Sequence, residues 1–436
     1  MKNIAVVGTG SRSEMYVAGI CSTYSSIWSI KALCDSNPQR MEVSRKLIVE
    51  GHSLPEPALY GPGDFETMIQ KHKIQLVIVV TMDRTHDDYI VRAMKAGCDV
   101  ITEKPLTIDA NRLARIWQAM NETGKSLRVG FNYRYAPRNT KVKELLSSGT
   151  IGRIHSVHFE WLLDTSHGAD YFRRWHRDKR NSGGLMVHKS THHFDLMNWW
   201  LSDRPSAVFA SGDLVFYGRE NAEKRGVNTF YNRGTGSPEP RDPFALDLEK
   251  DPNLKALYLD AEKFDGYRRD ESVFGNYISI EDDMSVIVEY QKGVRMTYHL
   301  TAYSPYEGFR IVFNGDKGRL EYDVVEATYV SGSVTDINRA DTTTRKEAEK
   351  VKIRVIPHWQ EGYEVEVVQS AEGGHGGGDR RLLADLFAEP KPADPYGCAA
   401  GIEDGAYSIA VGIAANRSMA ERRLVPIKEI VPSGLQ

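Results

Sequence analysis

The chain has 436 residues, 41% of them hydrophobic and 26% charged, and its formal net charge is −3 at pH 7. This length exceeds what a single hydrophobic core usually serves, so we expect two domains. Charges of both signs are mixed along the chain, which excludes a basic surface for nucleic acid or for an anionic membrane.

The N-terminus and the cysteines indicate the compartment. The chain passes from Met1 almost directly into an apolar segment, which leaves no room for a signal peptide, and no apolar run is long enough to span a membrane. The cysteines lie far apart, without the spacing of metal ligands: Cys21, Cys34, Cys98 and Cys398. We therefore expect a cytoplasmic protein with reduced thiols.

The first motif follows the first apolar run. Residues 4–7 predict a buried strand, and Gly8 and Gly10 allow a tight turn into a helix whose free amides can bind a diphosphate. Ser13 stands where the G-x-G-x-x-G fingerprint has its third glycine, so the motif is weaker than the full fingerprint. A glycine pair after an apolar strand is also compatible with a simple turn.

Asp35 strengthens the dinucleotide interpretation, because it ends the next apolar run, residues 28–34. A carboxylate at this distance from the glycine turn accepts hydrogen bonds from the adenosine ribose and would repel a 2′-phosphate, which favours NAD over NADP. The alternative is that Asp35 only caps the turn formed by residues 35–38.

Up to residue 131 the pattern alternates between apolar runs and helical segments, which predicts an α/β fold with a doubly wound parallel sheet. The runs are residues 4–7, 30–34, 76–81, 100–102 and 127–131. Ligands of such sheets bind at the carboxyl ends of the strands. The residues expected to bind the cofactor follow these runs: Gly8, Gly10, Ser11, Arg12, Asp35, Thr81, His86, Glu103 and Lys104.

From residue 132 the pattern changes to long alternating runs, which predict an α+β domain with a mainly antiparallel sheet and helices on one face. The runs are residues 154–163, 208–217, 284–290, 294–301, 309–313 and 319–325. We therefore expect domains at 1–131 and 132–436, with helices at 379–387 and 405–422 and an exposed loop at 332–350. Residues 218–275 fit neither period, and their aromatic side chains favour an ordered lid over a disordered insert.

Lys104 follows the run at residues 100–102 and should reach the nicotinamide end of the cleft. A partly desolvated lysine beside a cationic ring has a lowered pKa, which suits it to hold or deprotonate a substrate hydroxyl. A surface lysine in a loop is the alternative.

A second cluster begins at a glycine pair, residues 183–184. A helical interpretation of the following residues puts His188, His192 and Asp195 on one face, where His192 can accept a proton as a hydride leaves the adjacent carbon. The alternative is a set of histidines that border the core. His188 and His192 also have zinc-ligand spacing, with His193 or Asp195 able to assist, but no Glu follows His188 as in the metalloprotease helix, so we assign no metal.

These motifs together resemble the glucose-fructose oxidoreductase and inositol dehydrogenase family (Gfo/Idh/MocA) over nearly the whole chain. They are, in order, the Gly8–Gly10 turn, Asp35, residues 81–86, Glu103-Lys-Pro105, Arg134 and residues 183–195. The resemblance implies an N-terminal Rossmann domain and a C-terminal α/β domain with a large open sheet. That sheet often forms an oligomer interface, so we expect a homodimer or homotetramer.

The resemblance also implies NAD(P)-dependent redox chemistry at a sugar or cyclitol hydroxyl. Lys104 matches the active-site lysine of the family and His192 its catalytic histidine, while His86 would lie near the nicotinamide. At His188 the commoner family pattern has aspartate, so His188 is expected to act in its place as donor, acceptor or ligand.

Substrate contacts are expected from four residues: Arg134, Trp175, His193 and His375. An aromatic side chain such as Trp175 can stack on the apolar face of a sugar. Three other aromatic residues are candidates for the same contact, or for the core: Trp161, Tyr171 and Tyr303. His375 lies among glycines and could reach over a cleft, although a mobile connector is an equal alternative.

We therefore expect an NAD-dependent oxidoreductase that acts on a sugar, glycoside or polyol. One alternative is an NAD-dependent glycosidase that oxidises a hydroxyl transiently, because the loop at 374–377 and the insert are similar to features of that branch. The other is a sugar- or dinucleotide-binding regulator without catalysis.

Overall fold

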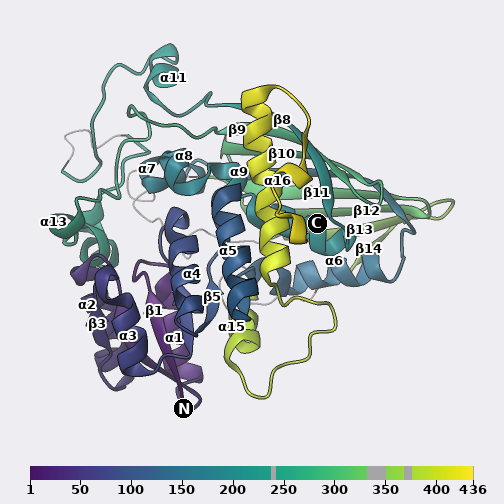
Figure 1. The fold of residues 1–436 in the computed structure, drawn as a ribbon. Coiled ribbons are helices and arrows are strands. Elements are labelled where there is room, and N and C mark those ends of the chain that lie inside the picture. Colours follow the sequence, from purple (N-terminus) through teal and green to yellow (C-terminus); the bar gives the residue numbers. More distant parts are fainter. Residues whose placement is uncertain (237–241, 331–349, 368–375, 436) are drawn as a thin grey trace.

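The structure is a computed structural model that describes residues 1–236, 242–330, 350–367 and 376–435 (Figure 1). The expected loop at 332–350 and His375 therefore lie outside the described residues, apart from Lys350. Within the described part of the chain, no helix combines the length and the apolar character needed to cross a lipid bilayer.

The N-terminal sheet has six parallel strands in the order β3-β2-β1-β4-β5-β6, which is the doubly wound arrangement expected from the sequence. Its strands are β1 (Lys2–Val7), β2 (Trp28–Cys34), β3 (Ala58–Tyr60), β4 (Leu76–Val79), β5 (Asp99–Thr102) and β6 (Leu127–Val129). The main helices are α1 (Ser13–Thr23), α2 (Pro38–Lys46), α3 (Phe65–His72), α4 (His86–Lys95) and α5 (Ala110–Thr123). The sequence pattern missed β3, a three-residue edge strand without a buried residue.

The second sheet has nine strands in the order β14-β13-β12-β11-β7-β10-β9-β8-β15, and every pair is antiparallel except β10 with β7. Six strands match the predicted runs: β7 (Ile154–Asp164), β8 (Pro205–Asp213), β9 (Asp283–Tyr290), β10 (Arg295–Ser304), β11 (Glu307–Gly315) and β12 (Gly318–Ala327). The sequence pattern missed β13 (Lys350–Pro357), β14 (Tyr363–Val365) and β15 (Val425–Pro426).

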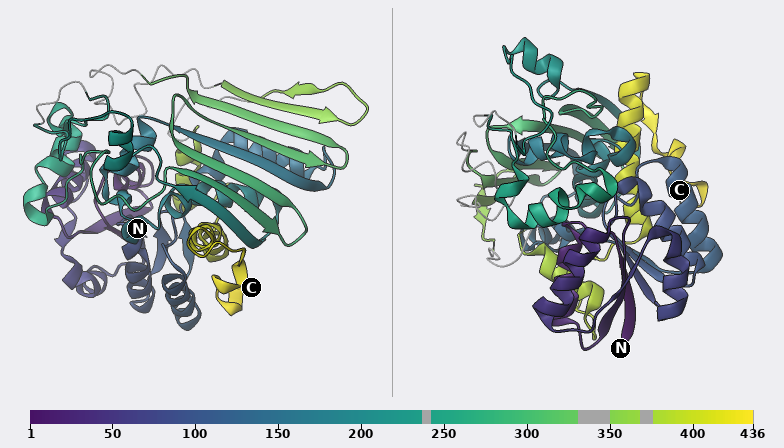
Figure 2. Two further views of the ribbon diagram at one scale, coloured as in Figure 1. Left: turned by 90° about the horizontal axis from the view of Figure 1, so that it is seen from above. Right: turned by 90° about the vertical axis from the view of Figure 1, so that its left-hand side faces the viewer.

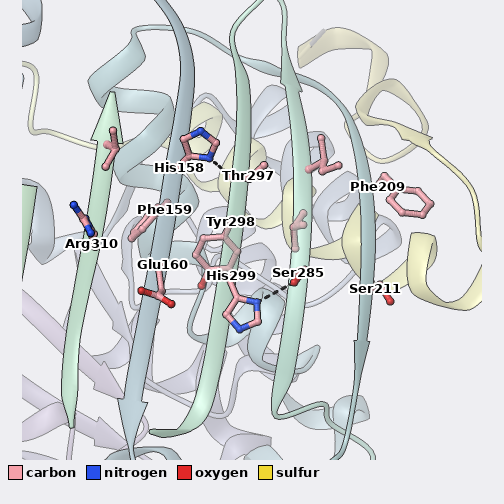
Figure 3. Close-up of a pocket in the computed structure, with 13 residues that line it drawn as sticks. His158, Phe159, Glu160, Phe209, Ser211, Ser285, Thr297, Tyr298, His299 and Arg310 are labelled. Carbon is pink, nitrogen blue, oxygen red and sulfur yellow. Dashed lines mark hydrogen bonds between the residues drawn. The ribbon is translucent and has the colours of Figure 1, made fainter. Parts of the chain in front are cut away.

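Helices cover one face of this sheet and leave the other open (Figure 2). Strands β9 and β10 bury every second residue, which is the pattern of a sheet with one packed face. On the open face, exposed side chains that include Ile287 and Arg310 line a shallow groove of about 480 Å³ (Figure 3).

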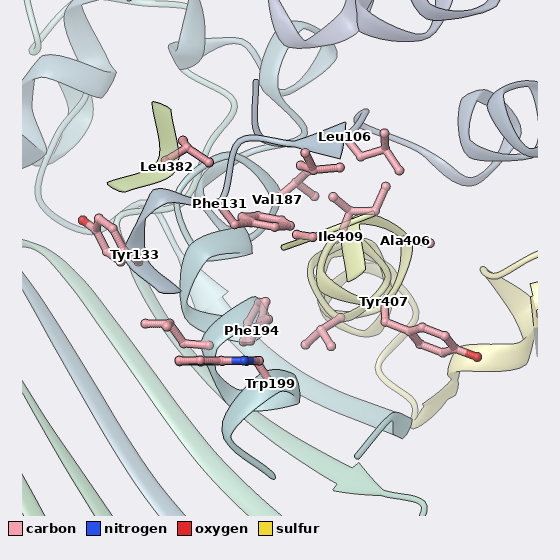
Figure 4. Packing of buried hydrophobic residues seen from close by; sticks show 14 of the residues in the cluster. Leu106, Phe131, Tyr133, Val187, Phe194, Trp199, Leu382, Ala406, Tyr407 and Ile409 are labelled. Carbon is pink, nitrogen blue, oxygen red and sulfur yellow. The ribbon is translucent and has the colours of Figure 1, made fainter. Parts of the chain in front are cut away.

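Helix α16 (Ile402–Glu421) joins the two sheets, because it packs against β6 as well as β8. Figure 4 shows the core on this helix, where Ile409 lies beside Phe131 and Val187. Gly412 of α16 allows a close approach, since a Cβ there would lie 2.3 Å from the carbonyl oxygen of Met186. The other helices of this half are α6 (Pro137–Ser147), α7 (His167–Arg173), α8 (Lys179–Ser182), α9 (Leu185–His188), α10 (Thr191–Leu201) and α15 (Gly378–Phe387).

The described residues of the expected insert at 218–275 form short helices and loops, which the sequence period did not predict. They are α11 (Arg219–Lys224), η6 (Leu248–Lys250), α12 (Pro252–Leu254), η7 (Lys255–Leu259) and α13 (Glu262–Asp265). Leu246, Leu248, Leu257 and Tyr258 form a small apolar core of their own, and Val43 of α2 packs against it. The insert therefore rests on the N-terminal sheet domain.

Candidate active site

A cleft of about 690 Å³ opens at the carboxyl ends of β1, β2, β4 and β5, where a doubly wound sheet binds its ligands. One side is lined by residues that follow these strands, among them Gly8, Asp35 and Lys104. The other side is lined by α9, α10, the segment around α7 and the insert. The cleft thus combines residues from both sheet domains.

The glycine turn packs closely against the backbone that follows β4. Gly8 has φ of +87°, and a Cβ at this position would lie 2.5 Å from the carbonyl oxygen of Val80, so only glycine fits. Ser13, in place of the third glycine, donates from Oγ to the carbonyl oxygen of Gly10 at 2.7 Å and begins α1. The amide of Ser11 is directed to the insert, where it donates to the hydroxyl of Tyr258 at 3.3 Å.

Asp35 lines the cleft, and its carboxylate also organises the backbone around it. Its Oδ2 accepts hydrogen bonds from the amide and the hydroxyl of Thr9, at 2.7 and 2.9 Å. Its Oδ1 accepts from the amide of Asn37 at 2.8 Å, which is the turn-capping bond. The carboxylate therefore lies beside the glycine turn.

Glu103 is buried and fixes its neighbours. Its Oε1 accepts hydrogen bonds from Nε of Arg12 at 2.7 Å and from the hydroxyl of Tyr16 at 3.0 Å. Its Oε2 accepts from the backbone amide of Lys104 at 3.1 Å. Arg12 also pairs with Asp379 of α15 at 3.3 Å, so a residue near the C-terminus supports the cofactor side of the cleft.

His86 lies in the wall of the cleft and connects two of its loops. Its Nδ1 lies 2.8 Å from the carbonyl oxygen of Pro105, and its Nε2 lies 3.1 Å from that of Thr81. Burial lowers the pKa of His86. This histidine thus positions the segments that carry Thr81 and Lys104.

Lys104 meets His188 within the cleft. The Lys104 Nζ lies 3.5 Å from both Nε2 and the carbonyl oxygen of His188. The other ring nitrogen of His188, Nδ1, lies 2.5 Å from Oδ2 of Asp83. Burial lowers the pKa of Lys104 to about 8, with Asp83 and Glu103 acting against that effect.

His192 also lines the cleft, and its ring stacks on that of Tyr133 with centroids 4.3 Å apart. The expected single helix is wrong in detail, because α9 ends at His188 and α10 begins at Thr191. The break occurs after one short turn, and it still brings both histidines to the cleft. The expected third member, Asp195, points elsewhere.

Arg134 and Asp195 form a buried ion pair and are only 2% and 1% exposed. Nε and Nη2 of Arg134 donate to the two carboxylate oxygens of Asp195 at 2.8 and 2.6 Å, and Nη2 also donates to Asp404 at 2.8 Å. A guanidinium held in this way is satisfied within the protein. We therefore correct the expectation that Arg134 binds substrate and that Asp195 faces the cleft.

His193 is likewise part of the core rather than a substrate contact. It is fully buried, its ring stacks on Trp161 with centroids 3.9 Å apart, and its Nδ1 lies 2.7 Å from the hydroxyl of Tyr298. Trp161 is itself fully buried and cannot stack on a sugar. Trp175 and Tyr171, by contrast, line the cleft.

Four residues that line the cleft carry no sequence prediction of their own: Asp83, Arg174, His176 and His167. Tyr258 and Tyr267 also line it, and they belong to the aromatic residues of the insert that favoured an ordered lid. Asp83 falls within the segment 81–86 that the motif marked, and His176 follows Trp175. Their polar character was visible, but the pairing of Asp83 with a residue 105 positions away was not.

The arrangement has the features of a dinucleotide site. No group of three or more His, Cys, Asp or Glu side chains that could hold a metal occurs in the described ranges of the chain. Nδ1 of His188 is already directed to Asp83. The glycine turn, the acidic residue after β2 and a cleft that ends at Lys104 and His192 fit a nicotinamide dinucleotide.

Comparisons with known proteins agree with this geometry. Residues 2–131 match the model of an oxidoreductase family's NAD-binding Rossmann fold, and residues 143–428 match that family's C-terminal alpha/beta domain. YteT of Bacillus subtilis, whose name describes it as an oxidoreductase, is 37% identical over 440 residues that cover 99% of each chain. An inositol 2-dehydrogenase of Rhizobium meliloti is 30% identical over 142 residues, 33% of this chain and 41% of that protein.

Solved structures share the fold at low sequence identity. The aldose-aldose oxidoreductase from Caulobacter crescentus aligns with a TM-score of 0.62 and 16% identity over 98% of this chain and 99% of that chain. The WlbA dehydrogenase from Bordetella pertussis, solved with NADH and UDP-GlcNAcA, aligns with a TM-score of 0.61 and 16% identity over 98% of each chain. From the matches over both domains, the chain belongs to the Gfo/Idh/MocA family of oxidoreductases, with an N-terminal NAD-binding Rossmann domain.

Proposed function

We propose that this protein is an NAD-dependent dehydrogenase that acts on a CH–OH group of a sugar, glycoside or polyol. The observation that carries the proposal is that a single cleft is lined by the glycine turn, by the contacting pair Lys104 and His188, and by His192. Inositol 2-dehydrogenases among the relatives support this class of substrate.

The cofactor-binding residues follow from the cleft. Gly8 would allow the tight turn, and the amides of Gly10 and Ser11 would hold the diphosphate with Arg12 nearby, once the Ser11 amide exchanges its bond to Tyr258. Asp35 would accept hydrogen bonds from the ribose. Because a carboxylate repels a 2′-phosphate, we propose NAD rather than NADP as the physiological cofactor. Thr81, His86 and Glu103 shape the nicotinamide end.

The chemistry divides between two side chains. The dinucleotide, when bound, supplies the acceptor or donor of the hydride. His192 takes the proton of the substrate hydroxyl, and the ammonium of Lys104 donates a hydrogen bond to the same oxygen as negative charge develops on it. Trp175 lines the cleft and offers a ring for the apolar face of a sugar.

The insert favours a second candidate, an NAD-dependent glycosidase. Tyr258 covers the amide of Ser11, and Arg40 of α2 pairs with Asp265 at 2.7 Å, so the insert spans the cofactor side of the cleft. A cofactor held under such a cover suits a cycle that oxidises a substrate transiently and then reduces it again. A third candidate is a regulator that binds a sugar or a dinucleotide without catalysis. It would be favoured if the protein turns over no substrate.

Formation of NADH, followed at 340 nm with a panel of sugars, glycosides and polyols, tests the dehydrogenase. Release of a leaving group from an aryl glycoside without net NADH would favour the glycosidase instead. If the protein binds NAD but turns over no member of either panel, the dehydrogenase proposal fails and a binding role replaces it.

The open face of the second sheet supports a proposal on assembly. Ile287 of β9 and Phe209 of β8 expose 46% and 41% of their surface there. His158 and Arg310 line other parts of the same groove (Figure 3). An apolar patch with a polar surround is typical of a protein interface. We propose a homodimer or homotetramer through this face, and light scattering of the purified protein measures its mass.

All four cysteines are free and buried, which supports a cytoplasmic location.

A further inference from the structure

Three side chains from distant parts of the sequence form a chain of contacts in the wall of the cleft. Asp83 lies in the turn after β4, His188 ends α9, and Lys104 follows β5. Asp83 Oδ2 is 2.5 Å from His188 Nδ1, and His188 Nε2 is 3.5 Å from Lys104 Nζ. The histidine therefore stands between a carboxylate and an ammonium.

The hydrogen bonds determine which way the imidazole is protonated. When Asp83 is ionised its carboxylate can only accept, so Nδ1 of His188 then carries the hydrogen and donates it to Asp83. The lone pair at Nε2 is then directed at Lys104, which donates to it and to the carbonyl oxygen of the same residue. Two acceptors of one residue thus fix the direction of the lysine side chain.

Burial and the neighbouring charges determine the protonation states of Lys104 and His188. Asp83 and His188 are only 3% and 8% exposed, and burial lowers the pKa of His188 well below its usual value, so this imidazole stays neutral. The positive charge of Lys104 is opposed by burial and by nearby cations, and the carboxylate of Asp83 makes the largest favourable contribution to it. Burial raises the pKa of Asp83 well above its usual value, and the neighbouring cations Lys104 and Arg174 act against that effect. The charged or titratable groups that face these three residues include Glu103, Arg12, Arg174, Lys189, His176, His86 and Tyr171.

Glu103 cannot take over this role through the lysine side chain. Its Oε1 accepts from Arg12 and Tyr16, and the hydrogen bond between its Oε2 and Lys104 goes to the backbone amide. Asp83 is thus the carboxylate that reaches the side chain of Lys104 through an intervening group.

We propose that Asp83 is a positioning residue, which acts through His188 to keep Lys104 protonated and directed into the cleft. This inference rests on the proposed role of Lys104 in dehydrogenation. The negative charge of Asp83 stabilises the ammonium of Lys104 although His188 lies between the two groups. His188 acts as a spacer between the two charges rather than as the base.

Competitive acetylation with limiting acetic anhydride tests the proposal without any substrate. The extent of labelling of Lys104 is measured across pH by mass spectrometry, and its midpoint reports the pKa. In the natural protein we expect a midpoint of about 8. In Asp83→Asn we expect the midpoint to fall by about one pH unit, because the favourable charge is lost.

The matched control is Glu307→Gln. Glu307 Oε1 lies 2.7 Å from Nδ1 of His167, which forms a second histidine–carboxylate pair at the cleft. This variant should leave the Lys104 midpoint unchanged. The double variant Asp83→Asn/His188→Asp moves the carboxylate next to Lys104 and should return the midpoint to 8 or above.

A measurement on the natural protein covers the case in which Asp83→Asn does not fold. Nitrogen-15 NMR of selectively labelled histidine should show His188 with hydrogen on Nδ1 and none on Nε2. Hydrogen on Nε2, or a Lys104 midpoint that stays or rises in Asp83→Asn, would overturn the proposal. Neither readout depends on NADH formation. A negative result from the substrate panel would therefore not decide the outcome of this test.

Discussion

Arg40 and Asp265 form an ion pair of 2.7 Å that joins α2 of the N-terminal sheet domain to the insert. Nε of Arg40 also donates to the carbonyl oxygen of Leu257 at 3.2 Å. Because Asp265 and Tyr258 line the cleft, this attachment holds the insert over the cofactor side.

We expect Arg40→Ala to release NAD about ten times faster than the natural protein, which corresponds to about 1.4 kcal/mol. Stopped-flow fluorescence of bound NADH measures the rate. Arg45→Ala is the control, because Arg45 lies on the same helix but pairs with Glu42 and Glu56 instead of the insert. Equal release from both variants would show that the insert does not retain the cofactor.

Gly8 should be required for cofactor binding. We expect Gly8→Ala to weaken NAD binding at least about tenfold, because the new Cβ would displace the backbone at Val80. Gly97 also has a positive φ, of +92°, but has no atom within 4 Å of a Cβ. Gly97→Ala should therefore reduce stability by about 1–2 kcal/mol through backbone strain and leave the NAD Kd unchanged, as calorimetry can check.

Lys104 should control both the rate and its pH dependence. Lys104→Ala should lower kcat about 10²–10⁴-fold while NAD still binds. In the natural protein, activity should fall as pH rises through about 8, because the ammonium then loses its proton. Lys104→Arg keeps the charge at high pH, so a decline near pH 8 in that variant would assign the titration to another group.

The buried pair of Arg134 and Asp195 should stabilise the fold rather than the reaction. Asp195→Asn should reduce the free energy of unfolding by about 3 kcal/mol, at the low end for a broken buried pair because Asp404 still pairs with Arg134. Glu223→Gln, at the exposed pair with Arg219, should change it by no more than about 0.5 kcal/mol. Urea titration measures both variants, and equal losses would contradict the assignment.

The sequence predicted the elements whose pattern is local. Residues 4–7 form a strand that is buried on both faces, which leaves a continuous apolar run in the sequence. Residues 154–163 form a strand that is buried mainly on one face, which leaves an alternating run. β3 and β14 have three residues each and lie at sheet edges, where little burial is needed to hold them. Such strands leave no periodic signal.

The position of a site residue could be predicted where a local sequence motif places it directly after a strand or on a helix. Lys104 and His192 line the cleft as expected, whereas Arg134 has its partner 61 positions away and lies in the interior. Asp83 became visible only when the fold brought it to His188. Pairings between distant buried charges depend on tertiary packing, which spacing along the chain does not encode.

Helix α15 returns from the C-terminal half to the first sheet domain. Asp379 pairs with Arg12, and the carbonyl oxygen of Phe387 accepts a hydrogen bond from the indole of Trp28 at 2.9 Å. A growing chain has therefore made the whole dinucleotide half before the helix that completes it exists. At about 5–20 residues per second, the interval between residue 131 and residue 387 is roughly 13–51 seconds. During translation the nascent N-terminal half must wait, with the surface that receives α15 still open to chaperones.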